Sequence, residues 1–139
     1  LKAGAAASRV AVHPGVRETL RQFQRDFARQ PGGAVIDGRD IGTVIAPEAP
    51  AKLYVTASAQ ARARRRWLQL RGTADAVSEA DILADIARRD ADDARRADSP
   101  MRRADDAVLL DTTEMTIEQA ADAARRIVEA ARARWEVSR

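Results

Sequence analysis

Short apolar runs separated by helical patterns are the feature that most constrains the fold of this chain. Residues 34–36 and 107–110 contain only apolar side chains, and residues 52–56 form a third candidate strand. Strands without polar alternation are typical of parallel sheets whose two faces are both covered by helices. We therefore expect an α/β fold in which 34–36, 52–56 and 107–111 are buried strands. Three strands are few for such a sheet, which suggests that the chain is incomplete at its N-terminus.

Helical patterns fill the intervals between these strands. The four expected helices cover residues 15–29, 58–70, 78–97 and 116–135. Ser58 is the expected N-cap of the second helix. Ser78 with Asp81, and Thr116 with Gln119, have the spacing of capping boxes at the next two.

Each terminal helix has one apolar face at helical spacing. In the first helix this face consists of Val16, Leu20, Phe23 and Phe27. In the last helix it consists of Ile117, Ala121, Ala124, Val128 and Ala131. We expect both faces to pack against the sheet.

The charge composition argues for a small anionic ligand and against a general nucleic-acid binder. The 24 basic and 21 acidic residues leave a net charge of only +3, whereas nucleic-acid binders usually carry a large basic surplus. Only Lys2 and Lys52 are lysines; arginine binds carboxylates and phosphates bidentately. Compositional bias accounts for most of the arginines. No apolar run approaches the ~20 residues of a membrane span, and the absence of cysteine excludes thiolate metal sites.

A charged motif follows the first expected strand. Asp37, Gly38, Arg39 and Asp40 occupy the position where parallel sheets bind ligands, beyond the carboxyl end of a strand. Two close glycines, Gly38 and Gly42, allow a ligand to approach the backbone of the loop. The motif therefore predicts a binding site, and the alternative is a polar turn with an internal Asp–Arg pair.

The helix that starts at Ser78 carries a stripe that changes from apolar to charged. The stripe consists of Ile82, Ile86, Arg89, Asp93 and Arg96. Because burying unpaired charges is costly, the pattern indicates a helix that leaves the core and overhangs an anion site. The alternative is a solvated helix with internal pairs such as Arg89 with Asp93.

The remaining charged and polar features are less specific. Arginines at 62 and 64–66 have the pattern of a solvated helix face, with one member possible at the site. His13 has no second metal ligand nearby. The sequence contains no GxxxxGK[ST] phosphate loop.

Several motifs, in order along the whole chain, resemble bacterial cytidylate kinases. They are residues 7–11, 16–17, 37–44 (DGRDIGTV), 57–58, 62–70, 89–96, 99–100 and 105–112. The resemblance implies a P-loop nucleoside-monophosphate-kinase-like parallel sheet covered by helices, incomplete at the N-terminus, with an Arg-rich helical lid. It divides one partial kinase domain, 1–139, into four parts. These are the end of the NMP-binding region and a helix (1–30), core strands and a helix (31–71), the lid and following helix (72–100), and the last strand and helix (101–139).

The resemblance also implies how the nucleotide is recognised. Ser8, Arg17 and Asp40 match the residues that read cytosine. The chemistry agrees, because a carboxylate accepts the cytosine N4 amino group, whereas the carbonyl of uracil would repel it. Arg89 and Asp93 match the positions that hold the ribose hydroxyls.

The same resemblance assigns the phosphate-binding groups. Arg39 and Arg96 match phosphate-binding arginines, and together with Arg89 they are expected to carry out catalysis. One of Arg65 and Arg66 matches a lid arginine near ATP. Asp37 is the residue expected to be related to the magnesium site, and no residue of the chain is expected to coordinate the metal directly.

By resemblance, the activity is transfer of the ATP γ-phosphoryl group to CMP or dCMP with Mg²⁺. The expected protein is a cytoplasmic monomer with no nucleic-acid or membrane partner. Since the ATP phosphate loop is missing from the sequence, we expect the 139-residue stretch alone to be inactive. The alternatives are another P-loop small-molecule kinase, of uridylate or shikimate type, and a non-catalytic Arg-rich RNA-binding module.

Overall fold

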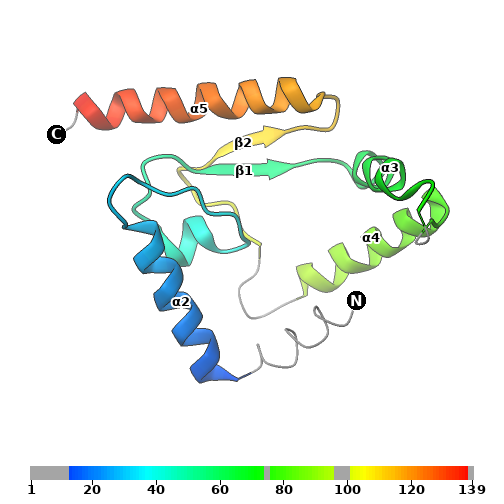
Figure 1. Ribbon diagram of the computed structural model, residues 1–139, viewed down its shortest axis with the longest axis horizontal. Helices are drawn as coiled ribbons and strands as arrows, with labels where there is room; N and C mark the ends of the chain where they lie inside the picture. The colour runs from blue at the N-terminus through cyan, green and yellow to red at the C-terminus, as the bar shows by residue number, and fades with distance from the viewer. Residues whose placement is uncertain (1–12, 74–75, 96–100, 138–139) are drawn as a thin grey trace.

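The computed structural model describes residues 13–73, 76–95 and 101–137. The elements, in chain order, are α2 (Pro14–Ala28), the single π-helical turn η1 (Ile41–Ile45), β1 (Leu53–Thr56), α3 (Ala59–Leu70), α4 (Glu79–Ala94), β2 (Val108–Asp111) and α5 (Ile117–Val137) (Figure 1). Predictions for Ser8 and Arg96 lie outside the described residues.

The two strands pair in parallel, as the apolar runs predict. The register places Leu53 opposite Val108 and Thr56 opposite Asp111. The Thr112 amide extends the ladder by donating to the Thr56 carbonyl oxygen at 2.9 Å. Both α3 and α4 therefore belong to the connection between two neighbouring parallel strands.

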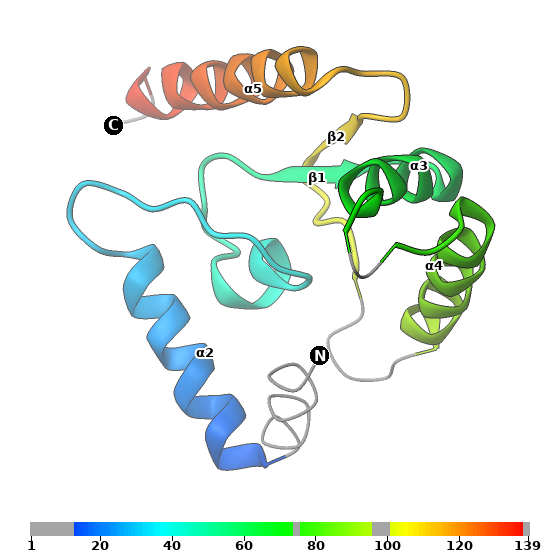
Figure 2. The ribbon, with the colours of Figure 1, turned by 45° about the vertical axis from the view of Figure 1, so that its right-hand side comes forward.

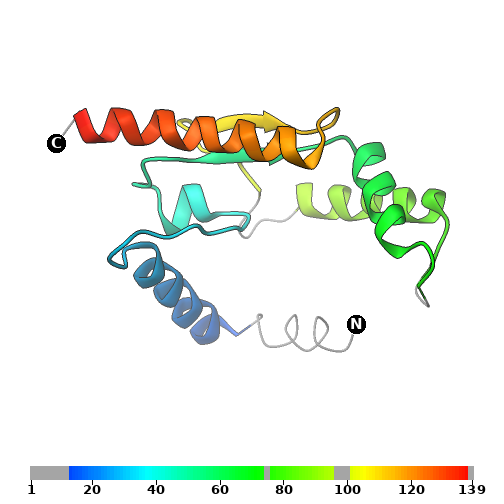
Figure 3. The same cartoon turned by 45° about the horizontal axis from the view of Figure 1, so that its top comes forward.

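Helices surround this small sheet on different sides. In Figures 1 and 2, α5 lies along one side of the sheet, and η1 and α2 lie on the other. Figure 3 shows α3 and α4 beyond the carboxyl ends of the strands. The buried apolar residues come from several elements and connections: Ile45, Ala46, Ala63, Ile82, Ala107, Leu110 and Ala131.

The helix starts follow the predicted capping chemistry. The Ser58 and Ser78 hydroxyls each accept a hydrogen bond, at 3.1 Å, from the amide three residues further on. Thr116 and Gln119 form a reciprocal capping box, with bonds of 2.9 and 3.2 Å between side chain and backbone. These predictions are confirmed because capping depends on neighbouring residues alone.

The expected strand at 34–36 is wrong, so region 31–71 contains one strand instead of several. The segment has no regular structure, and Val35 is 98% exposed. No other strand lies beside it among the described residues, and an extended segment without a partner cannot form a ladder. The loop expected at 38–42 is also shorter, because Ile41 begins the π-helical turn.

The predicted apolar faces of the terminal helices are only partly covered. In α5, Ile117 is 84% exposed, whereas Ala131 is buried and Ile127 is half-buried. The packed face of α5 is thus rotated from the predicted one. In α2, Phe23 is 67% exposed, and no residue of the helix is buried. None of the described helices is long and apolar enough to cross a membrane.

Candidate functional site

The charged motif at 37–40 leads directly into η1. The Asp40 carbonyl oxygen accepts hydrogen bonds from the amides of Thr43, Val44 and Ile45, at 3.3, 2.8 and 3.3 Å. This turn fixes the backbone of Asp40, whose side chain is half-buried. Asp37, at the start of the motif, is exposed.

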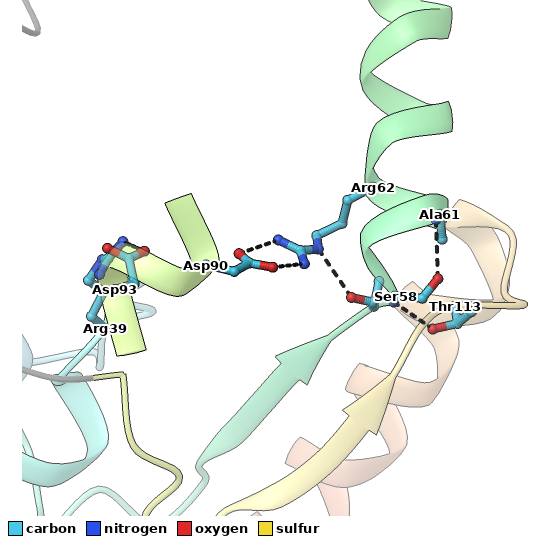
Figure 4. A network of polar contacts seen from close by, with 8 residues as sticks. Arg39, Ser58, Ala61, Arg62, Asp90, Asp93 and Thr113 are labelled. Atoms are coloured by element: carbon cyan, nitrogen blue, oxygen red, sulfur yellow. Dashed lines mark hydrogen bonds and ion pairs between the residues drawn. The ribbon is translucent and has the colours of Figure 1, made fainter. Parts of the chain in front are cut away.

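Arg39 joins this motif to α4. Its Nη2 donates a hydrogen bond to the Asp93 carboxylate, and the two residues are 54 positions apart in the chain (Figure 4). The hydrogen bond and the charge of Asp93 raise the pKa of Arg39 above its usual value. The Arg39 side chain is 41% exposed and that of Asp93 is 25% exposed. Two residues predicted for one site are therefore in contact.

Arg89 has a different partner. Its Nη2 lies 2.7 Å from the Asp85 carboxylate, one turn earlier in α4, and its side chain is 71% exposed. Arg88 also pairs with Asp85. In this arrangement the Arg89 guanidinium neutralises a carboxylate of its own helix and is accessible to solvent.

Arg62 and Asp90 form a bidentate ion pair that the sequence interpretation missed. Arg62 Nη1 and Nη2 donate to the two Asp90 oxygens at 3.0 and 2.5 Å, and Nε donates to the Ala57 carbonyl oxygen at 3.1 Å. The hydrogen bonds from Arg62 lower the pKa of Asp90. The run of arginines suggested a solvated face; the available signal was Asp90, which lies one turn before Asp93.

Arg65 and Arg66 differ in how firmly they are held. Arg65 Nη1 donates to the Thr112 hydroxyl at 3.1 Å, and Nη2 donates to the carbonyl oxygens of Thr112 and, at 3.3 Å, Met115. Arg66 is exposed and donates only a long hydrogen bond, of 3.5 Å, to Gln69. The Arg65 guanidinium is thus committed to the end of β2.

Arg17 lies in the first turn of α2 and is half-buried. In Figures 1 and 2, α2 and α4 lie on opposite sides of η1. The structure therefore brings Arg39, Asp40 and Asp93 to one region and leaves Arg17 on a separate element. No group of three potential metal-ligating side chains occurs in the described ranges.

Comparison with known proteins gives a consistent result along the chain. A family model described as cytidylate kinase matches residues 2–130. Cytidylate kinase of Caulobacter sp. (strain K31) is 69% identical over 133 residues, which cover 96% of this chain and 62% of the relative. That of Caulobacter vibrioides (strain NA1000 / CB15N) is 68% identical over 132 residues, or 95% of this chain and 62% of the relative. That of Cereibacter sphaeroides (strain ATCC 17023) is 58% identical over 128 residues, or 92% and 62%. The chain spans about 62% of the length of these relatives.

Proposed function

Because the chain belongs to the cytidylate kinase family, we propose that the full protein transfers the γ-phosphoryl group of ATP to CMP or dCMP. The products are ADP and the corresponding cytidine diphosphate. The proposed substrates are small, water-soluble nucleotides, and we propose a cytoplasmic monomer as the acting form.

The contact between Arg39 and Asp93 carries this proposal. The Arg39 guanidinium, in the charged motif at 37–40, donates a hydrogen bond to a carboxylate oxygen of Asp93 in α4. A phosphate offers the same charge and the same acceptor chemistry to a guanidinium. We propose that Arg39 binds the CMP phosphate, which replaces Asp93 as the anion. Asp93 is proposed to accept hydrogen bonds from the ribose hydroxyls.

Cytosine recognition is proposed for Asp40, Arg17 and Ser8. The fixed backbone of Asp40, beside Arg39, supports a carboxylate that accepts the N4 amino group of cytosine. Arg17 and Ser8 would donate to the O2 and N3 acceptors. Arg17 is carried by α2, which contacts η1, the turn that follows Asp40.

Phosphoryl transfer needs positioned positive charge more than covalent help from the protein. A CMP phosphate oxygen attacks the γ-phosphorus of ATP, and the bond to the β-phosphate oxygen breaks. Arg39, Arg89 and Arg96 are proposed to surround the transferred group when α4 closes over it. The high exposure of Arg89 leaves its guanidinium free to turn toward the phosphates at the expense of a surface ion pair, which is worth about 0–1 kcal/mol.

Magnesium is proposed to arrive with ATP and to neutralise charge on its phosphates. Mg²⁺ commonly uses one or two carboxylates together with phosphate and water oxygens. Exposed Asp37 offers a single carboxylate, which fits a metal held mainly by the nucleotide. The donor set of the described residues does not form an all-protein metal cage.

Arg66 is the proposed lid arginine on the ATP side. Its only hydrogen bond from the described residues is long, whereas Arg65 is held by Thr112 and Met115. The sequence contains no GxxxxGK[ST] loop, so we propose that the β- and γ-phosphates of ATP are bound by other parts of the protein. A polypeptide of residues 1–139 should therefore not turn over ATP and CMP in a coupled ADP assay. Appreciable turnover would contradict this.

The substrate proposal is tested with the full-length protein by measuring kcat/KM for CMP, dCMP and UMP. We expect a preference for the cytidine nucleotides. We expect Asp40→Ala to reduce the CMP/UMP preference by about 10-fold or more, since a hydrogen bond to a charged group is worth about 1.5–3 kcal/mol. Asp122→Ala, at an exposed ion pair on α5, is the matched control. An unchanged CMP/UMP ratio in Asp40→Ala would exclude Asp40 from cytosine recognition.

A further inference from the structure

We infer that Arg62 is a positioning residue, which holds α4 through Asp90 so that Asp93 is presented to the nucleotide. This inference rests on the proposed function, because it concerns how the proposed nucleotide-binding residues of α4 are placed. It assigns Arg62 and Asp90 a role that differs from the solvated surface suggested by the arginine run.

Arg62 is itself fixed to the end of the sheet. Its Nε bonds the carbonyl oxygen of Ala57, the residue directly after β1, at 3.1 Å. The next residue, Ser58, donates its amide to the Thr113 hydroxyl at 2.9 Å, which ties the same point to the segment after β2. Figure 4 shows these contacts around the start of α3. These bonds therefore fix the position of the Arg62 guanidinium relative to the carboxyl ends of both strands.

The other side of the same guanidinium holds α4. Both Nη atoms bond Asp90, at 3.0 and 2.5 Å, in the parallel two-bond geometry that fixes direction as well as distance. A single Lys ammonium lacks this planar fork. With Nε bound to Ala57, three of the five N–H donors of Arg62 are occupied.

Asp90 and Asp93 share one side of α4, since residues three apart are neighbours on a helix surface. Figure 4 shows Asp90 between Arg62 and the pair of Arg39 with Asp93. A continuous path of hydrogen bonds and helical backbone therefore runs from Ala57 through Arg62 and Asp90 to Asp93. A change in the Arg62–Asp90 bonds alters where Asp93 lies relative to Arg39.

The pair is suited to positioning and contributes little to global stability. The Arg62 and Asp90 side chains are 39% and 48% exposed, and ion pairs this exposed to solvent contribute little to stability. The hydrogen bonds from Arg62 nonetheless lower the pKa of Asp90, which favours the charged form that makes the pair. Loss of the pair should thus change nucleotide binding more than unfolding.

The chain offers a matched control in a second ion pair between α3 and α4. Arg64 Nη1 lies 2.9 Å from the Glu79 carboxylate, at the first residue of α4. It joins the same two helices and involves the same types of charge. Glu79 precedes Asp90 by eleven residues, about three helical turns. Removing the ion pair of Arg64 with Glu79 should therefore leave the position of Asp93 unchanged.

The test is a double-mutant cycle in the full-length protein, with steady-state kinetics for CMP at saturating ATP. We expect Arg62→Gln and Asp90→Asn each to raise KM for CMP by about 2- to 5-fold, the range that an exposed ion pair supports. The KM of the double variant for CMP should be no higher than that of either single variant, because the two residues act through one contact. Arg62→Lys should recover only part of the affinity. The unfolding midpoint and kcat should change little.

Distinct results would overturn the inference. An unchanged KM in Arg62→Gln and Asp90→Asn, in a protein that phosphorylates CMP, would reject the positioning role and leave the proposed function intact. An equal rise in KM for Arg64→Gln or Glu79→Gln would show general loosening of the two helices and also reject it. If the unchanged full-length protein does not phosphorylate CMP, the proposed function fails, and this inference fails with it. The near-isosteric Asp90→Asn keeps the test valid if Arg62→Gln does not fold.

Discussion

The Asp93 carboxylate is bound to Arg39, so the structure pairs two groups that are proposed to bind different parts of one nucleotide. The phosphate of CMP must therefore compete with Asp93 for the guanidinium. The two effects of Asp93, competition for Arg39 and binding of ribose, can be separated by choosing ligands with and without a nucleoside.

Replacing Asp93 by Asn should change phosphate and CMP binding in opposite directions. We expect tighter binding of inorganic phosphate, by up to about 5-fold, because an exposed ion pair is worth no more than about 1 kcal/mol. CMP should bind more weakly, since the charged acceptor for its ribose is lost. Isothermal titration calorimetry measures both affinities. Asp92→Asn, at a carboxylate 4.0 Å from Arg95, is the control. Weaker phosphate binding in Asp93→Asn would contradict the competition.

Replacing Gly38 by Ala should displace the charged motif. A Cβ atom at Gly38 would lie 2.9 Å from Cγ1 of Ile41, in the first turn of η1, so the Ile41 side chain must shift from its rotamer, at a cost of about 0.5–1.5 kcal/mol. We expect a lower free energy of unfolding and a higher KM for CMP, because Arg39 is the next residue. Gly15→Ala is the control, since nothing lies within 4 Å of a Cβ atom there. A Gly38→Ala variant as stable in urea unfolding as the unchanged protein would rule out this steric requirement.

Arg65 should matter more for stability than its neighbour Arg66. Arg65 donates to Thr112, whose side chain is buried and also donates to the Thr56 carbonyl oxygen at 3.1 Å. Arg65→Ala leaves the hydroxyl and carbonyl oxygens of Thr112 without this donor, which we expect to lower the free energy of unfolding by about 1–3 kcal/mol. Arg66→Ala removes one long bond to Gln69 and should change it by less than about 0.5 kcal/mol. Thermal or denaturant unfolding of the full-length protein provides the comparison, and equal losses would contradict it.

Stability in acid should depend on Lys52 and Asp106. Hydrogen bonds from the Lys52 ammonium, at 2.6 and 2.9 Å, hold the pKa of Asp106 below its usual value. The folded state therefore binds this proton less readily than the unfolded state. The contribution is complete above the usual Asp pKa of about 3.9 and is lost as the pH falls through the lowered pKa.

Two variants isolate this contribution. Asp106→Asn should lower the urea midpoint at pH 7 and make its decline below about pH 4 shallower. Lys52→Met should remove the same acid dependence, together with the bond from Lys52 to the Pro47 carbonyl oxygen. A decline in Asp106→Asn as steep as in the unchanged protein would show that this pair does not contribute.

The features that depend on neighbouring residues could be predicted from the sequence. The hydroxyls of Ser58, Ser78 and Thr116 cap helices as expected, because each cap requires only residues within one turn. The apolar run at 107–110 likewise predicted β2 and its parallel pairing. The similar run at 34–36 did not become a strand, because a strand also requires a partner that local pattern does not reveal.

The polar contacts of the site could not be predicted from spacing alone. The sequence placed Arg89 and Asp93 on one stripe, but Arg89 pairs with Asp85, and Asp93 contacts Arg39 across 54 positions. Several carboxylates of α4 lie one turn apart, so each arginine has more than one possible partner. Only the placement of α4 against the loop at 37–40 and against α3 selects among them.

The parallel pairing of β1 with β2 has a consequence for how α4 can move. Residues 57–107 leave the sheet at Thr56 and return to it at Val108, so both ends of this excursion are attached to one ladder. Swinging α4 outward with α3 breaks no interstrand hydrogen bond. Among the hydrogen bonds and ion pairs described here, only Arg39 with Asp93 joins α4 to a segment other than α3. Such a movement breaks the ion pair of Arg39 with Asp93 and, because α3 moves as well, the bonds from Arg65 to Thr112 and Met115. Dissolved salt weakens only the ionic part of this resistance, because the Debye length falls from about 30 Å at 0.01 M to about 3 Å at 1 M.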